Sequence, residues 1–285
     1  LLYLMTTLRL LPAMLACCAI SFSSCNSDND DNYGFGEETD DGVTTVDRID
    51  PSQVFTGLKP VSVAGMQISY MEDGLVKQII RRADGENEFV SFSYPALARS
   101  VSEGKLVRMD IVSGTERHQY DMRVGNMGFV DYAEETEYEN GKAEETQYWW
   151  FSYTPDGHLE SIEGTKDDHK VTKFYYSDGN IIGMTAIDRD GDSESASVDY
   201  GATPIANVGA VMLFDEIFDT DVDDIIYIYY AGLLGKATKN LPVSAVQTEG
   251  KQSVTVSFAW TLDAGGYPVM MTPSDEPYSY TFAWK

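Results

Sequence analysis

The sequence predicts an all-β fold in which an antiparallel meander of strands curls into a barrel or half-barrel. Three observations support this. Apolar and polar residues alternate along much of the chain, Asp-Gly pairs separate the alternating runs, and tyrosines recur at a spacing of about 24 residues. Alternation turns one strand face toward a core, and Asp-Gly supplies the positive φ angles of a tight hairpin turn. We expect roughly ten to fourteen antiparallel strands.

Residues 1–24 are the predicted signal peptide. Arg9 precedes an apolar run over residues 10–20, and small residues then lead to Cys25. This order is typical of a secretory signal, and the run is too short for a bilayer that needs about 20 apolar residues. The leader resembles a bacterial lipoprotein signal, in which the cysteine becomes the acylated first residue of the mature chain. We therefore expect lipid attachment at Cys25 and, through it, a membrane anchor.

Two other interpretations of the leader stay open, namely cleavage before Cys17 and an uncleaved buried helix. The acidic run after Cys25 resembles the surface-export signal of outer-membrane lipoproteins in certain Gram-negative anaerobes, so we expect an outer-membrane, surface-exposed protein.

All three cysteines lie at or before Cys25. Their position excludes disulfides, cysteine-ligated metals and cysteine nucleophiles from the mature domain.

The net charge of the chain limits which macromolecules it can bind. It carries 46 acidic and 20 basic residues, for a net charge of −26. Such a surface repels phosphate backbones, so we expect no nucleic-acid partner. Residues 25–55 are acidic without apolar periodicity and are predicted to be a flexible tether. Residues 56–285 are predicted to form one β-meander domain.

The internal repeat consists of a tyrosine-bearing strand, a turn and a second apolar run. Its clearest copies are residues 151–162 and 174–182. With this pattern the chain resembles lipoproteins of unknown function whose domain is described as having a porin-like fold, with Tyr-Asp-Gly repeats akin to those of RHS-type proteins. The resemblance covers roughly residues 56–285, and its most specific element is the segment 230–242. It implies a curled antiparallel sheet and a lipid-binding role, with no established activity.

A two-helix insertion near residues 205–236 is predicted to interrupt the strands. Asn207 can cap a first helix that runs to about Phe218, with its apolar residues on one face. A second helix is expected after the acidic residues 219–224, which suit a helix N-terminus. We expect the segment 208–234 to pack its apolar side chains against the concave side of the sheet, as a plug or as a moving lid.

One acidic hairpin is a weak metal candidate. Carboxylates recur at alternate positions around a glycine, which resembles the start of a calcium loop; the residues are Asp188, Asp190, Asp192 and Glu194. The spacing to the last acid is too short for an EF-hand. An exposed hairpin with its turn at 190–191 explains the same pattern, and the acids at 219–224 are explained as the start of a helix.

Catalytic signals are weak. The three histidines, His118, His158 and His169, are scattered, and the motifs of metalloproteases, serine hydrolases and phosphate loops do not occur. We therefore expect no enzyme activity and no cofactor, although paired carboxylates of a glycosidase could hide among 46 acids. Tyr148 with the pair 149–150 could stack a sugar, but adjacent strand residues face opposite ways, so at most one tryptophan lies on each face.

The sequence thus favours a lipid-anchored, non-catalytic surface protein that holds an apolar or amphipathic ligand inside the curled sheet. Two alternatives stay open. One is a structural or adhesive surface protein whose curl is fully packed, and the other is a glycan binder or glycoside hydrolase.

Overall fold

The computed structural model describes residues 49–83, 86–94, 107–165, 170–213 and 224–285. Contacts divide the chain into two compact units, Leu1–Asp41 and Gly42–Lys285, and every described residue belongs to the second. The leader, Cys25 and most of the acidic tether lie outside the described residues, so the predicted boundaries at 24 and 55 stay predictions. No helix among the described residues is long and apolar enough to cross a membrane.

Sixteen described strands make up one antiparallel sheet. In chain order they are β1 (Pro60–Val63), β2 (Met66–Tyr70), β3 (Val76–Ala83), β4 (Glu86–Ser93), β5 (Val107–Ser113), β6 (Glu116–Val124), β7 (Val130–Glu139), β8 (Lys142–Tyr153), β9 (Leu159–Gly164), β10 (Val171–Ser177), β11 (Asn180–Ile187), β12 (Ser193–Asp199), β15 (Ser244–Glu249), β16 (Gln252–Leu262), β17 (Pro268–Pro273) and β18 (Tyr280–Trp284). Outside this sheet are the 3₁₀ turn η2 (Pro51–Gln53), the strand pair β13 (Ile205–Ala206) and β14 (Asn240–Leu241), and helix α3 (Ile225–Tyr230).

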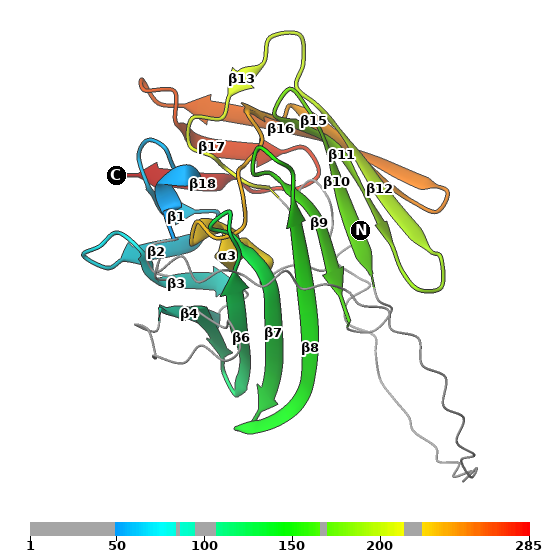
Figure 1. Ribbon diagram of the computed structural model, residues 1–285. Helices are drawn as coiled ribbons and strands as arrows, with labels where there is room; N and C mark the ends of the chain where they lie inside the picture. The colour runs from blue at the N-terminus through cyan, green and yellow to red at the C-terminus, as the bar shows by residue number, and fades with distance from the viewer. Residues whose placement is uncertain (1–48, 84–85, 95–106, 166–169, 214–223) are drawn as a thin grey trace. The chain divides into compact units, whose positions relative to one another are not determined.

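The sheet closes into a barrel (Figure 1). Each strand pairs with its neighbours in the chain, and β1 completes the circle by pairing with β18, where Val63 lies opposite Phe282. The described strands depart from this order once. The segment between β12 and β15, called the excursion below, carries β13, α3 and β14 and lies outside the sheet, so β12 pairs directly with β15. The predicted all-β meander is confirmed, with more strands than the roughly ten to fourteen expected.

The Asp-Gly turns have the backbone geometry that the repeat predicts. Gly157 and Gly179 adopt φ angles of +91° and +78°, in the region that side chains with a Cβ rarely enter. Gly157 lies between β8 and β9, and Gly179 between β10 and β11. These hairpins therefore reverse the chain where the sequence places their turns.

Aromatic side chains join neighbouring strands at one rim of the barrel. The Tyr176 hydroxyl donates to the carbonyl oxygen of Leu159 at 2.9 Å, and the Tyr200 hydroxyl donates to that of Ile181 at 2.7 Å. Comparable bonds run from Tyr70 to Pro60, Tyr94 to Val76, Tyr153 to Val130, Trp260 to Pro242 and Trp284 to Pro268. In most of them the donor stands at the end of one strand and the acceptor at the start of the strand before it, so the bond closes the open end of a hairpin.

This bond accounts for the recurrence of tyrosine at strand ends. Burial raises the pKa of Tyr176 above its ordinary value and that of Tyr200 to about 12, so both hydroxyls keep the proton that they donate. The tyrosine ring is buried, and its hydroxyl reaches a backbone carbonyl at the rim and so gives that acceptor a hydrogen-bond partner. Kinship of this pattern with the repeats of RHS-type proteins stays a prediction.

Helix α3 and the residues after it fill the interior of the barrel. All six residues of the helix are buried, and Tyr227, Tyr229 and Ile228 have no exposed surface. Leu233 is also fully buried, and its carbonyl accepts the backbone N–H of Val130 on the barrel wall at 2.8 Å. For its described residues, the predicted packing of the insertion against the concave side of the sheet is therefore confirmed, apart from Val208, which is 41% exposed.

The first predicted helix is wrong where the structure describes it. Residues 207–213 form a turn and an extended loop, while 214–218 lie outside the described residues. The Asn207 side chain caps no helix because its amide bonds both the N–H and the carbonyl of Val211, and also the carbonyl of Thr238. Ala210 has a φ angle of +51°, which a right-handed helix excludes.

The second predicted helix is confirmed at Ile225–Tyr230, but it is shorter than expected and ends before Gly235. Asp224 stands at its N-cap position without capping it. Its carboxylate instead accepts the Tyr120 hydroxyl at 2.7 Å, because the helix starts inside the barrel next to β6. The other acids of the run, 219–223, lie outside the described residues.

Tyr176→Phe should lower the free energy of unfolding by about 1–2 kcal/mol, since it leaves the buried Leu159 carbonyl without its partner. The matched control is Tyr175→Phe, on the next residue. The Tyr175 side chain is 46% exposed and its hydroxyl bonds Thr185, so the change should stay within about 0.5 kcal/mol. Urea unfolding of both variants measures the difference. Equal midpoints would show that the rim bond does not stabilise the barrel.

Candidate functional site: a pocket at the barrel rim

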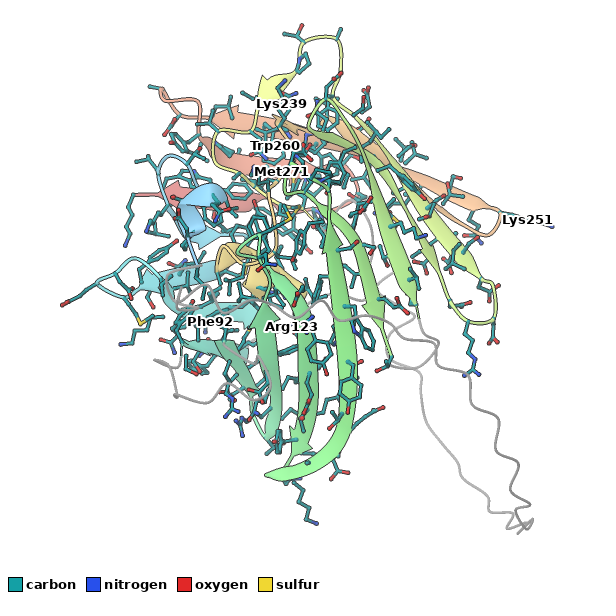
Figure 2. All side chains as sticks on the ribbon, in the orientation of Figure 1. Phe92, Arg123, Lys239, Lys251, Trp260 and Met271 are labelled. Carbon is teal, nitrogen blue, oxygen red and sulfur yellow. The ribbon has the colours of Figure 1, made fainter. Side chains whose placement is uncertain are left out.

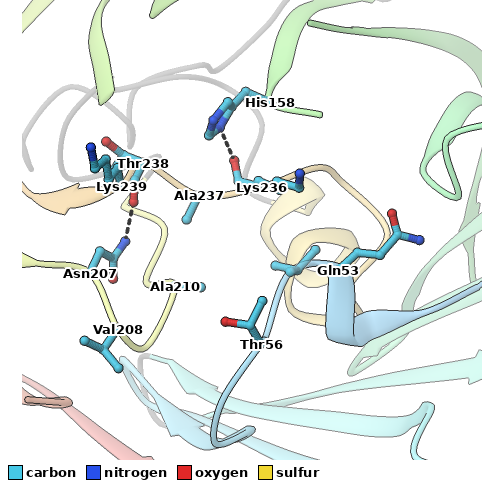
Figure 3. A pocket seen from close by; sticks show the side chains of 11 residues that line it. Gln53, Thr56, His158, Asn207, Val208, Ala210, Lys236, Ala237, Thr238 and Lys239 are labelled. Carbon is cyan, nitrogen blue, oxygen red and sulfur yellow. Dashed lines mark hydrogen bonds between the residues drawn. The ribbon is translucent and has the colours of Figure 1, made fainter. Parts of the chain in front are cut away.

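A pocket of about 420 Å³ opens where four segments of the chain meet at the rim (Figure 3). The end of η2 and the residues after it form one side, the β8–β9 turn a second, the loop after β13 a third, and the return from α3 to β14 the fourth. The lining residues are Gln53, Val54, Thr56, His158, Asn207, Val208, Ala210, Lys236, Ala237, Thr238 and Lys239. Its size lies at the lower end of the range for small-molecule sites.

The return segment is held in place by the turns of the sheet. The N–H of Lys236 donates to the Gly157 carbonyl and that of Lys239 donates to the Gly179 carbonyl, each at 2.8 Å. Gly235 permits this approach, because a Cβ there would lie 2.9 Å from the Gly157 oxygen. The Asp-Gly turns therefore serve both as hairpin turns and as the support of the pocket wall.

The polar floor of the pocket is fixed by hydrogen bonds. His158 is buried and its Nδ1 lies 3.0 Å from the Lys236 carbonyl oxygen, which can only accept, so Nδ1 carries the proton (Figure 3). The ring stacks on Tyr176 with centroids 4.7 Å apart, and Nε2 lies 3.6 Å from the Asp156 carboxylate. The Tyr200 hydroxyl gives its proton to the Ile181 carbonyl, so the Thr238 hydroxyl donates to Tyr200 at 2.6 Å and accepts the Ile181 N–H.

The pocket combines cationic and apolar lining. Lys236 and Lys239 are exposed at its edge, and the described lining residues include no acid. The Lys236 ammonium donates to the Asp156 carbonyl at 2.7 Å, which holds it beside the mouth. The hydrogen bond from Thr154, together with His158 and Lys236, lowers the pKa of Asp156. The two lysines give the pocket edge positive groups in a chain whose net charge is −26.

The predicted metal hairpin does not gather ligands. Gly191 has a φ angle of +89° at the turn, and Asp188 uses its carboxylate to accept the N–H of Asp192 at 2.9 Å. Glu194 accepts the ammonium of Lys170 at 3.1 Å, while Asp190 is exposed. The structure therefore agrees with the alternative interpretation, an exposed hairpin, for Asp188, Asp190, Asp192 and Glu194. Cys25 and His169 lie outside the described residues.

The prediction that the two adjacent tryptophans lie on opposite faces of the sheet is confirmed. Trp149 faces inward, where its indole N–H donates to Glu135 at 2.9 Å, and Trp150 faces outward with 42% of its surface exposed. Tyr148 and Tyr132 share the outer face with Trp150, and the three ring centroids lie 5.9 to 6.4 Å apart. The rim pocket itself was missed, because its residues come from four distant segments. The only sequence signal was the specific segment 230–242.

Comparisons with known proteins agree with the barrel. Residues 126–270, just over half of the chain, match the family described as "Domain of unknown function (DUF4595) with porin-like fold". A solved porin-like protein from Bacteroides uniformis superposes with a TM-score of 0.52 at 16% identity, covering 80% of this chain and 94% of the other. A porin-like protein from Bacteroides vulgatus gives 0.45 at 13% identity, covering 80% and 98%. None of the curated proteins matches. Likeness at such identity shows the fold alone.

Gly235→Ala should lower the free energy of unfolding by about 2 kcal/mol or more, because it adds a close contact with the Gly157 carbonyl to the strain of a φ angle of +83°. Gly114→Ala is the control, since Gly114 has a φ angle of +58° and an added Cβ there meets open space. It should cost about 1 kcal/mol. Thermal and urea unfolding compare the two. A Gly235 variant as stable as the control would show that the return segment is not held against the turn.

Proposed function

The chain belongs to the DUF4595 family with porin-like fold, and we propose that it is a lipid-anchored protein of the outer-membrane surface that binds a small amphipathic, anionic ligand without catalysis. The rim pocket carries this proposal. Val54, Ala210 and Ala237 offer apolar surface beside Lys236 and Lys239, an arrangement that suits a short apolar group ending in an acid. The ligand was expected inside the curl, but α3 occupies that space, so the pocket at the rim is the better place for it.

The outer face of the barrel supports attachment by a lipid instead of by the strands. Arg108 and Asp121 pair at 2.7 Å across β5 and β6, and Arg117 pairs with Asp110 at 2.9 Å on the same face. The inward-facing Met109 is fully buried. Barrels that span a bilayer have the reverse polarity, with apolar residues outside and polar residues inside. Acylation of Cys25 would hold such a barrel at a membrane while its wall stays in water.

A second candidate function, glycan binding, has one observation in its favour. Tyr132, Tyr148 and Trp150 form a cluster of rings on the outer face, and Tyr148 and Trp150 are 39% and 42% exposed. Sugars stack on such rings. The cluster lies on a convex wall instead of in a pocket, which suits a weak contact with an extended chain better than capture of a single small molecule.

The pocket proposal is tested by native mass spectrometry of the full-length protein purified from its own cells. We expect a bound molecule of acidic, amphipathic character in the wild type, and at least a tenfold lower occupancy after Lys236→Gln combined with Lys239→Gln. Lys251→Gln combined with Lys173→Gln removes the same charge elsewhere, and Lys251 lies away from Lys239 at the β15–β16 turn (Figure 2). The proposal fails if the wild type carries no ligand or if both double variants retain it equally. Loss of glycan binding after Trp150→Ala, with the lysine variants unaffected, would support the second candidate.

Cys25→Ala should release the protein from the membrane fraction or leave its precursor unprocessed, since it removes the acyl acceptor. Fractionation and immunoblotting of cells that express each form measure this. Cys17→Ala is the control, and it should leave both processing and anchoring unchanged. Normal maturation and membrane retention of the Cys25 variant would overturn the anchoring proposal.

A further inference from the structure

A polar cluster lies inside the barrel, away from the rim pocket. Glu135 on β7 stands directly opposite Tyr120 on β6 and Gln147 on β8, so all three share the inner face. His118 is two residues before Tyr120 and faces the same way. Asp224 reaches the group from the start of α3. Four segments thus bring an imidazole, two carboxylates and an amide together.

The distances within the cluster are those of a potential metal site. His118 Nδ1 lies 2.9 Å from Glu135 Oε1 and 3.9 Å from Asp224 Oδ2, and the donor atoms of the three residues lie within 4.8 Å of one another. A tetrahedral zinc ion with bonds of about 2.0–2.2 Å needs donor atoms separated by about 3.3–3.6 Å. Small side-chain rotations would bring the three atoms to those separations.

An unsatisfied oxygen provides a second, independent indication of a missing positive group. Gln147 is 4% exposed, and its Oε1 has no hydrogen-bond partner. The Nε2 of the same amide donates to the Glu135 carboxylate. That bond holds the amide group next to Glu135, and flipping the amide would instead set two oxygens against each other. Buried acceptors without a partner are rare in folded proteins and call for an explanation such as an ion.

The charge of the cluster also matches a dication. Glu135 is 2% exposed and Asp224 is half-buried, so two carboxylates lie close together where solvent screens them only partly. Further acids near the cluster, Glu88 and Glu137, add negative potential.

We propose that His118, Glu135 and Asp224, with the Gln147 carbonyl oxygen as a fourth donor, bind a divalent transition-metal ion such as Zn²⁺ inside the barrel. An imidazole nitrogen among oxygen donors favours a transition metal over Ca²⁺ or Mg²⁺. The His118 and Asp224 side chains are 32% and 24% exposed, which leaves the ion a route from solvent. Because Asp224 begins α3, the ion would join the interior helix to the wall formed by β6, β7 and β8. This proposal does not depend on the ligand of the rim pocket.

The test is calorimetric titration of Zn²⁺ into the full-length protein after removal of metals with a chelator. We expect one equivalent to bind, a rise in the unfolding temperature on binding, and competition by Co²⁺ but not by Mg²⁺. His118→Ala and Asp224→Asn should each weaken binding at least tenfold. Asp224→Asn keeps an acceptor for the Tyr120 hydroxyl, so it guards against loss of the fold. Circular dichroism of the metal-free variants checks that the barrel remains.

The matched control is Asp190→Asn combined with Asp192→Asn, which removes two acids from the hairpin that the sequence offered as a metal candidate. It should leave the affinity unchanged. X-ray absorption at the zinc edge should show one imidazole and several oxygen donors. Stoichiometric binding that survives both cluster variants, or that disappears with the hairpin variant, would overturn the proposal. So would a wild-type protein that binds no zinc.

Discussion

The architecture depends on the hydrogen bonds between the chain's internal excursion and the walls that enclose it. A closed sixteen-strand barrel cannot fill its own interior with strand side chains alone. Helix α3 supplies the missing volume, and the residues after it are tied to the wall through Val130, Gly157 and Gly179. Without those backbone bonds the excursion would bury polar groups without partners. The barrel and its filling therefore depend on each other.

The rim bonds follow the same logic at the edge of the sheet. Tyrosine occurs at strand ends because its ring can be buried while its hydroxyl reaches a carbonyl of the neighbouring strand, as Tyr153 does with Val130 and Tyr176 with Leu159. Trp260 and Trp284 make the equivalent bond with an indole N–H. The same rim carries the turns that support the return segment, so the features that close the hairpins also form one wall of the pocket.

Two features with different chemistry result from this plan. At the rim, Lys236 and Lys239 gather positive charge beside apolar surface in a strongly acidic chain. Deeper in the barrel, His118, Glu135 and Asp224 gather negative charge where a core would normally be apolar. Both are assembled where the excursion meets the wall. The excursion thus contributes residues to each candidate site as well as volume to the core.

The class of fold and many of its turns could be predicted from the sequence, because these properties depend on local patterns. Alternation, the Asp-Gly pairs and the tyrosine spacing predicted the meander, the positive φ angles of Gly157 and Gly179, and the opposite faces of Trp149 and Trp150. The acidic hairpin at 188–194 was also explained by its local pattern. Each of these features involves residues within one hairpin.

Only the tertiary structure decided what depends on contacts between distant segments. Asn207 has the sequence of a helix cap, yet its amide bonds the Thr238 carbonyl, and residues 208–213 form no helix. Asp224 stands where an acid would cap the start of a helix, yet its carboxylate accepts the Tyr120 hydroxyl instead. The rim pocket joins loops and turns from four distant segments, and the cluster around Glu135 is complete only when Asp224 meets the neighbouring strands β6, β7 and β8. The closure of the barrel determines which segments meet, and a sequence pattern that repeats with each hairpin does not predict contacts between distant segments.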